Sequence, residues 1–115
     1  MIEKTNLEKI ERVNYLFDFY GLLLTKKQQS IVDLYYKENF SLGEIGEQLN
    51  ISRQAVHDIL SRSIQALERW EAKLNLYEAY IQRVKDGRRI LTLLKNDKLT
   101  PAEIKEVRAF IKTFL

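Results

Sequence analysis

The segment from Ser41 to Leu60, "SLGEIGEQLNISRQAVHDIL", constrains the fold more than any other part of this 115-residue chain. Ser41 and Glu44 have the spacing of a capping box, which begins a helix, and Ser52 is suited to cap a second helix. Asn50 stands between the two, and asparagine adopts a left-handed backbone more readily than most residues other than glycine. The segment therefore predicts two short-linked helices.

The same segment carries the residues that would hold those helices at a sharp angle. Gly46 supplies a small residue where the second helix would cross the first. The apolar residues are spaced to lock the pair together, and they are Ile45, Leu49, Ile51, Val56 and Ile59. A plain helical hairpin would share only the apolar periodicity, whereas a helix-turn-helix motif needs all of these features at these offsets. We therefore predict a helix-turn-helix motif over residues 41–63.

The second helix of the motif would turn polar residues outward. Arginine and glutamine side chains match the guanine and adenine edges in the major groove. The candidate DNA-binding residues are Ser52, Arg53, Gln54, His57, Ser61 and Arg62. The simpler alternatives are a solvated first turn, an ordinary exposed histidine, and an ion pair between Arg62 and Asp58 four residues earlier.

The charge of the motif argues against strong attraction to nucleic acid. Glu44, Glu47 and Asp58 outnumber Arg53 between Ser41 and Leu60, although the whole chain has a net charge of +3. The basic excess lies in residues 82–98. The candidate contacts to a DNA backbone or to RNA are Arg69, Arg83, Lys85, Arg88 and Arg89. The alternative is a solvated helical face.

Composition favours an all-α protein and disfavours an enzyme. Four glycines and one proline are too few for the many turns of a β domain. Without cysteine, with one histidine and without a glycine-rich phosphate loop, the sequence predicts no metal, no cofactor and no small-molecule substrate. A charged N-terminus and the lack of a long apolar run predict a cytoplasmic protein that does not enter the membrane.

Helix signals divide the rest of the chain. Capping boxes at Thr5 with Glu8, Thr25 with Gln28, and Thr100 with Glu103 predict helices over 5–20, 25–37 and 100–114. Gly21 is expected to end the first helix. From Arg53 a helical pattern continues to about residue 86, with a possible break near Asn75, and Gly87 is expected to end it before a short helix over 88–96.

A heptad pattern runs along the long helix and suggests self-association. The predicted dimer seam consists of Leu67, Trp70, Leu74, Tyr77 and Ile81. The alternative is that helices of the tail fold back and cover Trp70, Leu74 and Tyr77 within one chain. We expect residues 1–115 to form a single all-α domain in which residues 64–115 are a dimerisation tail. The expected assembly is a homodimer.

Two families resemble this chain over residues 6–75. The run "LLTKKQQSIVDLYYKENFSLGEIGEQLNISRQAVHDILSRSIQALERW" resembles region 4 of bacterial sigma factors, which reads the promoter −35 element. Together with "NYLFDFYGLLLTKKQQ", it is still more similar to the YlxM family of small helix-turn-helix proteins. One departure concerns the site: sigma factors often place lysine or arginine directly after the buried valine, where this chain has His57 and Asp58 after Val56.

The resemblance implies a function as well as a fold. It implies a sigma-region-4-like, winged-helix-like class of fold without an evident wing, in a bacterial, non-catalytic regulator. Genes of the YlxM family lie beside those of the signal recognition particle pathway, which implies a part in that pathway. The sequence thus predicts a DNA-binding regulator. The alternative is a module that docks on signal recognition particle RNA or protein, or on RNA polymerase.

Overall fold

The computed structural model describes residues 4–115, with side chains from residue 6 onward, and over that range its regular secondary structure is helical, with no strand. Two irregular turns are η1, a 3-10 turn over Gly21–Leu23, and η2, a π-helical turn over Asp33–Lys37. The α-helices are α1 Lys4–Tyr20, α2 Lys26–Val32, α3 Leu42–Leu49, α4 Arg53–Leu74, α5 Leu76–Leu93 and α6 Pro101–Lys112. The predicted all-α class is confirmed. None of these helices is long and apolar enough to span a membrane.

The described chain divides into two compact units, with the boundary after Tyr77. The N-terminal unit contains α1 to α4 and the first residues of α5, and the C-terminal hairpin contains Glu78–Leu115. Residues 64–77, which the sequence assigns to the tail, therefore pack with the helix-turn-helix motif. Whether the chain folds as one domain stays a prediction.

Side-chain caps begin four of the helices at the positions that the sequence predicts, three of them as capping boxes. Each box satisfies two backbone N–H groups that a helix start leaves without a partner. The boxes join Thr25 with Gln28, Ser41 with Glu44, and Thr100 with Glu103, and Ser52 Oγ accepts from Ala55 N at 3.0 Å to cap α4. The expected box at Thr5 and Glu8 involves the Thr5 side chain, which lies outside the described side chains.

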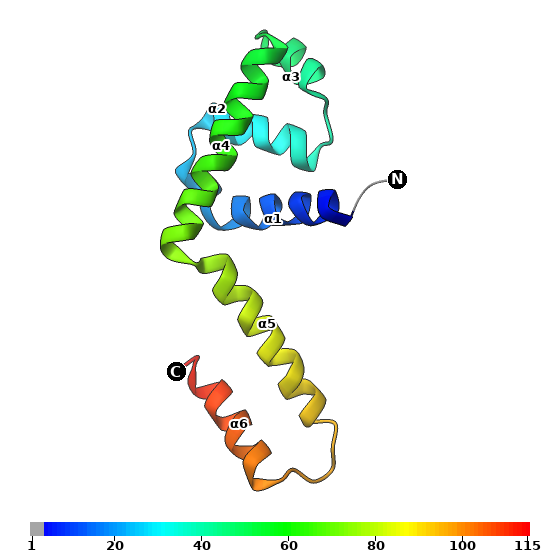
Figure 1. Ribbon diagram of the computed structural model, residues 1–115, viewed down its shortest axis with the longest axis vertical. Coiled ribbons are helices and arrows are strands. Elements are labelled where there is room, and N and C mark those ends of the chain that lie inside the picture. The colour runs from blue at the N-terminus through cyan, green and yellow to red at the C-terminus, as the bar shows by residue number, and fades with distance from the viewer. Residues whose placement is uncertain (1–3) are drawn as a thin grey trace. The chain divides into compact units, whose positions relative to one another are not determined.

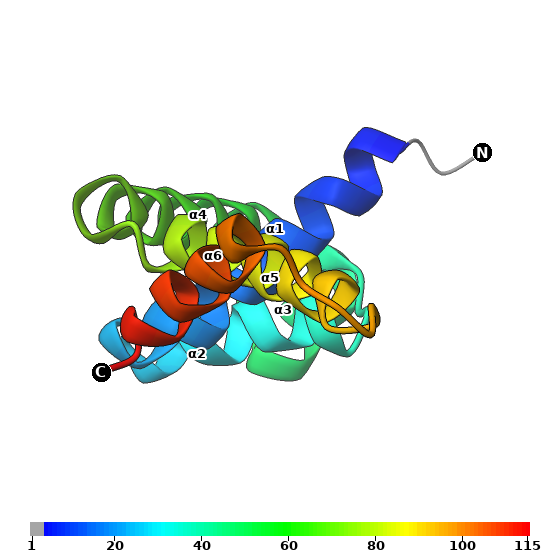
Figure 2. The same cartoon turned by 90° about the horizontal axis from the view of Figure 1, so that it is seen from below.

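The core of the N-terminal unit forms around α4. Helices α1, α2 and α3 all pack against it, and Figure 1 shows α4 in green passing beside each of them. The first turns of α1 project beyond the other helices of the unit (Figure 2), and Leu7 is exposed there. The buried apolar side chains are Val13, Leu16, Tyr20, Leu24, Ile31, Val32, Ile45, Val56, Leu60, Ala66 and Leu67. Their burial holds the four helices as one unit.

The turn between α3 and α4 forms as the motif requires. Asn50 takes the left-handed conformation with φ 58°, and Ile51 N donates to the Gly46 carbonyl oxygen at 2.9 Å. A Cβ on Gly46 would lie 2.7 Å from the Ile51 carbonyl oxygen. The turn backbone can approach α3 this closely only because residue 46 has no side chain. The predicted roles of Gly46 and Asn50 are confirmed by this geometry.

The long helix breaks at Asn75, where the sequence allows a break. Asn75 is left-handed with φ 54°, and its N–H donates to the Glu71 carbonyl oxygen. The expected end at Gly87 is wrong, as is the separate helix over 88–96, because α5 continues through Gly87 to Leu93. One interior glycine costs about 1 kcal/mol, which the surrounding helix formers offset. Gly21 does follow the end of α1, without a left-handed backbone.

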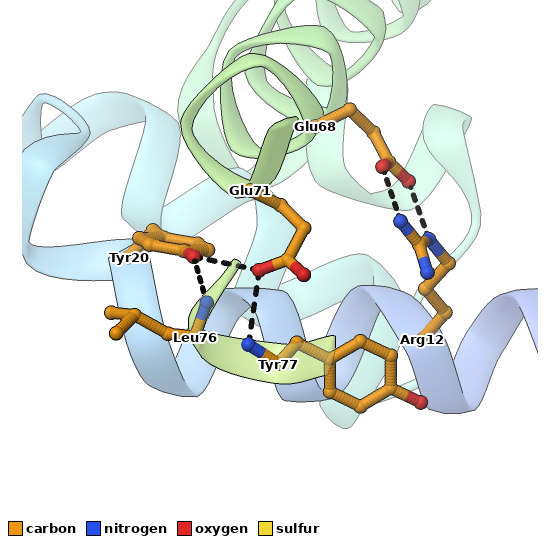
Figure 3. A network of polar contacts seen from close by, with 6 residues as sticks. All are labelled: Arg12, Tyr20, Glu68, Glu71, Leu76 and Tyr77. Carbon is orange, nitrogen blue, oxygen red and sulfur yellow. Dashed lines mark hydrogen bonds and ion pairs between the residues drawn. The ribbon is translucent and has the colours of Figure 1, made fainter. Parts of the chain in front are cut away.

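A buried carboxylate holds the break against α1 (Figure 3). Glu71 is 5% exposed and accepts from the Tyr20 hydroxyl at 2.6 Å and from Tyr77 N at 3.0 Å. The Tyr20 hydroxyl in turn accepts from Leu76 N at 3.1 Å. Leu76 and Tyr77 begin α5, so their N–H groups would otherwise lack helical partners. The network satisfies both groups where α4 ends.

A second contact from α1 flanks this network. Arg12 donates from Nε and Nη2 to the two carboxylate oxygens of Glu68, at 2.8 and 2.7 Å. Its guanidinium lies 5.6 Å from the ring centroid of Tyr77, and the Tyr77 ring stacks on Tyr15 at 5.2 Å between centroids. A bidentate pair fixes the orientation of both side chains. Two points along α1 are therefore joined to the second half of α4.

Replacing Gly46 by alanine is expected to destabilise the N-terminal unit by about 1–3 kcal/mol, because the new methyl group would collide with backbone. Gly43 provides a matched control in the same helix, since a Cβ there would meet only Ser41 Oγ at 3.9 Å. Gly43→Ala should be neutral or stabilising by up to about 1 kcal/mol. Urea unfolding of both variants measures this, and equal effects would contradict the close approach.

Tyr20→Phe is expected to lower the unfolding free energy by about 1–3 kcal/mol at neutral pH, since Glu71 and Leu76 N lose a partner. Burial raises the pKa of Tyr20, and the hydrogen bond to Glu71 raises it further. A raised folded pKa gives stability that is complete below about pH 10 and is lost as pH rises through the folded value.

The difference in stability between wild type and Tyr20→Phe should therefore shrink above about pH 10. Urea titrations from about pH 8 to 11 measure that difference. Because the other tyrosines titrate in both proteins, the subtraction isolates Tyr20. A difference that stays constant over this range would show that the hydroxyl does not hold the break.

Candidate nucleic-acid interface

The start of α4 presents most of the residues that the sequence assigns to DNA. Arg53, Gln54, His57 and Arg62 are exposed, and Ser61 is half-buried. Ser52 is exposed too, but its hydroxyl accepts from Ala55 N as the helix cap. Val56 and Leu60 are buried on the opposite side and hold α4 against the unit. The buried face thus fixes which side chains of the helix can reach a partner.

Asp58 pairs with its predicted DNA-binding neighbours instead of with Arg62. Its Oδ1 accepts from Gln54 Nε2 at 2.9 Å and lies 3.5 Å from His57 Nδ1. One of the two N–H groups of the Gln54 amide is therefore engaged within α4. A carboxylate in this place also repels phosphate, so Asp58 weakens any duplex contact made by the first turns of α4.

Two arginines further along α4 are left without an ion pair among the described residues. Arg62 and Arg69 are both exposed and lie two helical turns apart, about 10 Å along the axis. Arg12, by contrast, is held by Glu68. Arg62 and Arg69 can therefore meet phosphate without breaking an ion pair among the described residues.

A hollow that the sequence does not predict lies beside the exposed face of α4. It has a volume of about 270 Å³, and α1, η2 and α4 contribute to it. Its polar and aromatic lining includes Lys9, Tyr35, Tyr36, His57, Ser61 and Gln65. From the sequence we expect Tyr35 in the core and Tyr36 partly exposed. Tyr36 is half-buried as expected, but Tyr35 is half-buried as well, and the two ring centroids lie 5.0 Å apart. The two adjacent tyrosines are the one feature of the sequence that points to this hollow.

Not all of the basic residues of the tail are available to contact nucleic acid. Arg83, Lys85 and Arg88 are exposed on α5. Arg89 instead donates from Nε and Nη2 to the two carboxylate oxygens of Glu106 on α6. The hydrogen bond from Arg89 lowers the pKa of Glu106, so the pair stays ionised at neutral pH.

The residues of the expected dimer seam fall into different environments. Leu67 is completely buried in the core of its own chain, and Trp70 and Tyr77 pack against that core. Helix α1 makes this contact, through Tyr15 stacked on Tyr77. Leu74 is exposed, and Ile81 is half-buried in the C-terminal hairpin. That these residues take part in a dimer stays a prediction.

Comparison with known proteins agrees with this geometry. Residues 7–109 match the model of the UPF0122 family, described as "Putative helix-turn-helix protein, YlxM / p13 like". The chain belongs to this family. The match covers the motif, the Asn75 break and most of the C-terminal hairpin, so the family pattern extends well beyond the helix-turn-helix itself.

Relatives within the UPF0122 family cover most of the chain. A protein of Oceanobacillus iheyensis is 46% identical over 102 residues, which are 89% of this chain and 96% of the relative. A protein of Bacillus mycoides is 45% identical over 88% of this chain and 92% of its own length. One from Bacillus licheniformis is 53% identical over 69% and 74%. The family is one of helix-turn-helix proteins and not an enzyme family.

Asp58→Asn is expected to strengthen binding to duplex DNA about fivefold at low salt, because one like-charge contact near the surface, worth about 1 kcal/mol, is removed. Asparagine can still accept from Gln54 Nε2, so the helix should keep its stability. Glu47→Gln, on α3, removes the same charge outside α4 and serves as the control. Fluorescence anisotropy with a labelled duplex measures both, and an equal gain from both would show only a net-charge effect.

Proposed function

We propose that this protein is a DNA-binding regulator and that it takes part in the signal recognition particle pathway. The observation that supports DNA binding is the sharp α3–α4 turn, with Asn50 left-handed and Gly46 against the turn backbone. That turn leaves the start of α4 exposed with Arg53 at its first position. The link to signal recognition rests on the family resemblance alone.

In this proposal the first turns of α4 enter the major groove. Arg53 would contact a guanine edge or a phosphate, and Gln54 would exchange its bond to Asp58 for an adenine edge. Arg62 and Arg69 would contact the phosphates, which supply most of the affinity and make it salt-dependent. Arg83, Lys85 and Arg88 add positive charge from α5.

A partner-binding function is the second candidate, and two observations favour it. Asp58 occupies Gln54 and places a negative charge on the face that would meet the duplex. The hollow with Lys9, Tyr35 and Tyr36 beside that face suits an unpaired base better than a duplex, since aromatic rings stack on splayed bases. The partner would be signal recognition particle RNA or protein, or RNA polymerase.

The deciding experiment titrates the full chain against a mixed-sequence DNA duplex and against signal recognition particle RNA, each at two salt concentrations. Duplex binding through Arg62 and Arg69 should weaken as salt rises. Arg62→Gln and Arg69→Gln should each lower the slope of log affinity against log salt by about 0.9, the value for one phosphate contact on duplex DNA.

Arg108→Gln is the charge-matched control, because Arg108 is exposed on α6 and lies outside the proposed interface. If it lowers the slope as much as the α4 variants, binding follows net charge and the interface is wrong. Preference for the RNA, or no duplex binding at low salt, would replace the DNA function with the partner-binding one.

A further inference from the structure

The C-terminal hairpin buries very little of its apolar surface. Helices α5 and α6 run antiparallel (Figure 1) and are joined by the Arg89–Glu106 pair and by the approach of Phe110 to Gly87. Only Ile90 and Leu93 are buried within the described part of this hairpin. Five large side chains, Leu91, Leu94, Ile104, Ile111 and Phe114, are between 39% and 65% exposed.

Apolar residues alternate in steps of three and four along both helices. On α5 the stripe is Tyr80, Val84, Gly87, Leu91 and Leu94. On α6 and the turn after it, the stripe is Ile104, Val107, Ile111 and Phe114. This is the heptad spacing with which helices pack against further helices in coiled coils and four-helix bundles. A helix that only covers its neighbour in a hairpin does not need a second stripe.

The two stripes lie on the same side of the hairpin. Counted from the contact residues Ile90 and Phe110, each stripe is centred about a quarter turn further round its helix. In an antiparallel pair, the same sense of rotation from the facing line leads to the same side. The stripes therefore form one continuous surface, which we call the seam face.

Most charged residues of the hairpin lie away from the seam face. Lys85, Lys105 and Lys112 fall on the opposite side of the pair, and Arg88 and Arg108 fall at its two edges. No charged residue belongs to either stripe, but Arg83 on α5 and Glu103 on α6 lie beside them, on the side nearer the other helix. Apart from the Tyr80 hydroxyl the stripes consist of apolar residues, so another apolar heptad face matches them better than nucleic acid or a charged protein surface does.

We propose that the seam face pairs with the seam face of a second copy, so that two hairpins form a four-helix bundle. A second copy brings two helices with the same spacing, and a two-fold axis places each stripe against an equivalent uncharged surface. The exposed seam side chains amount to roughly several hundred Å² of apolar area per chain, comparable with the apolar part of a stable interface of about 800 Å² per partner.

This dimer is not the one that the sequence predicts. Leu67 and Trp70 of the expected seam are used within the N-terminal unit. The proposed dimer instead uses the apolar stripe that follows Tyr77 on α5, together with the stripe of α6. The proposal does not depend on nucleic acid binding, because it concerns a different surface of the chain.

The test is sedimentation velocity of the full chain without nucleic acid, over a range of micromolar concentrations. Wild type should be dimeric. Leu91→Glu and Ile111→Glu should each weaken the dimer about tenfold or more, because each places two carboxylates in the apolar interface. Leu22→Glu is the matched control, since Leu22 is 91% exposed in the N-terminal unit and lies outside the seam face. Circular dichroism checks that each variant keeps its helices.

Cross-linking gives an independent measurement. The chain has no cysteine, so Ile111→Cys carries a single thiol on the seam face and Lys85→Cys a single thiol on the opposite face. A short bismaleimide should join two copies of Ile111→Cys and not of Lys85→Cys. A monomeric wild type, a dimer that survives both glutamate variants, or a monomer that binds anionic lipid vesicles through Leu91 would overturn the proposal.

Discussion

The packing of α1, α2 and α3 against a single face of α4 is the constraint on which the rest of the N-terminal unit depends. Val56, Leu60 and Leu67 form that face, and each is nearly or completely buried. Once it is covered, the exposed side of α4 is fixed, with Gln54, Arg62 and Arg69 on it. The close approach of Gly46 to the Ile51 carbonyl oxygen then sets how α3 meets α4. Scaffold and candidate interface are thus two sides of one helix.

The charges of the candidate interface indicate that the shape of the motif and its attraction to phosphate depend on different residues. Capping, a left-handed asparagine and a glycine contact give the turn its shape, and none of these requires positive charge. Asp58 even holds Gln54 within the helix. In the proposed interface, Arg62 and Arg69, outside the turn, supply most of the attraction to phosphate. The residues that shape the turn and the residues proposed to attract DNA are therefore different.

Short-range signals made most of the fold predictable. The boxes at Thr25, Ser41 and Thr100, the left-handed Asn50 and the possible break near Asn75 depend on residues within a few positions of one another, and each forms. The prediction that Gly87 ends the helix was wrong because a single glycine destabilises a helix too little to end it.

Long-range contacts were hidden from the sequence for a different reason. Glu71 looks like a surface carboxylate, since nothing near it shows that Tyr20, 51 positions earlier, will bury it. The same holds for Leu67 and Trp70, which a heptad pattern assigns to a partner and which pack into the core of their own chain instead. Tyr35 and Tyr36 likewise join His57 in one hollow only through the tertiary fold. Candidate residues on one helix were foreseeable, and their neighbours from other helices were not.

Asn75 divides the heptad pattern of the long helical region into two parts. The first part packs within the N-terminal unit, and the second part lies on the surface proposed to form the dimer. Before Asn75, Leu60 and Leu67 are buried in the core of the same chain and Trp70 packs against that core, whereas Leu74 is exposed. After Tyr77 the pattern continues on α5, where no described helix of the hairpin covers Leu91 or Leu94. A continuous helix would have carried one uninterrupted stripe, whereas the left-handed residue and the Glu71 network end the first stripe within its own unit. The proposed contacts of α4 to nucleic acid and the proposed contacts between copies can consequently be tested by separate substitutions.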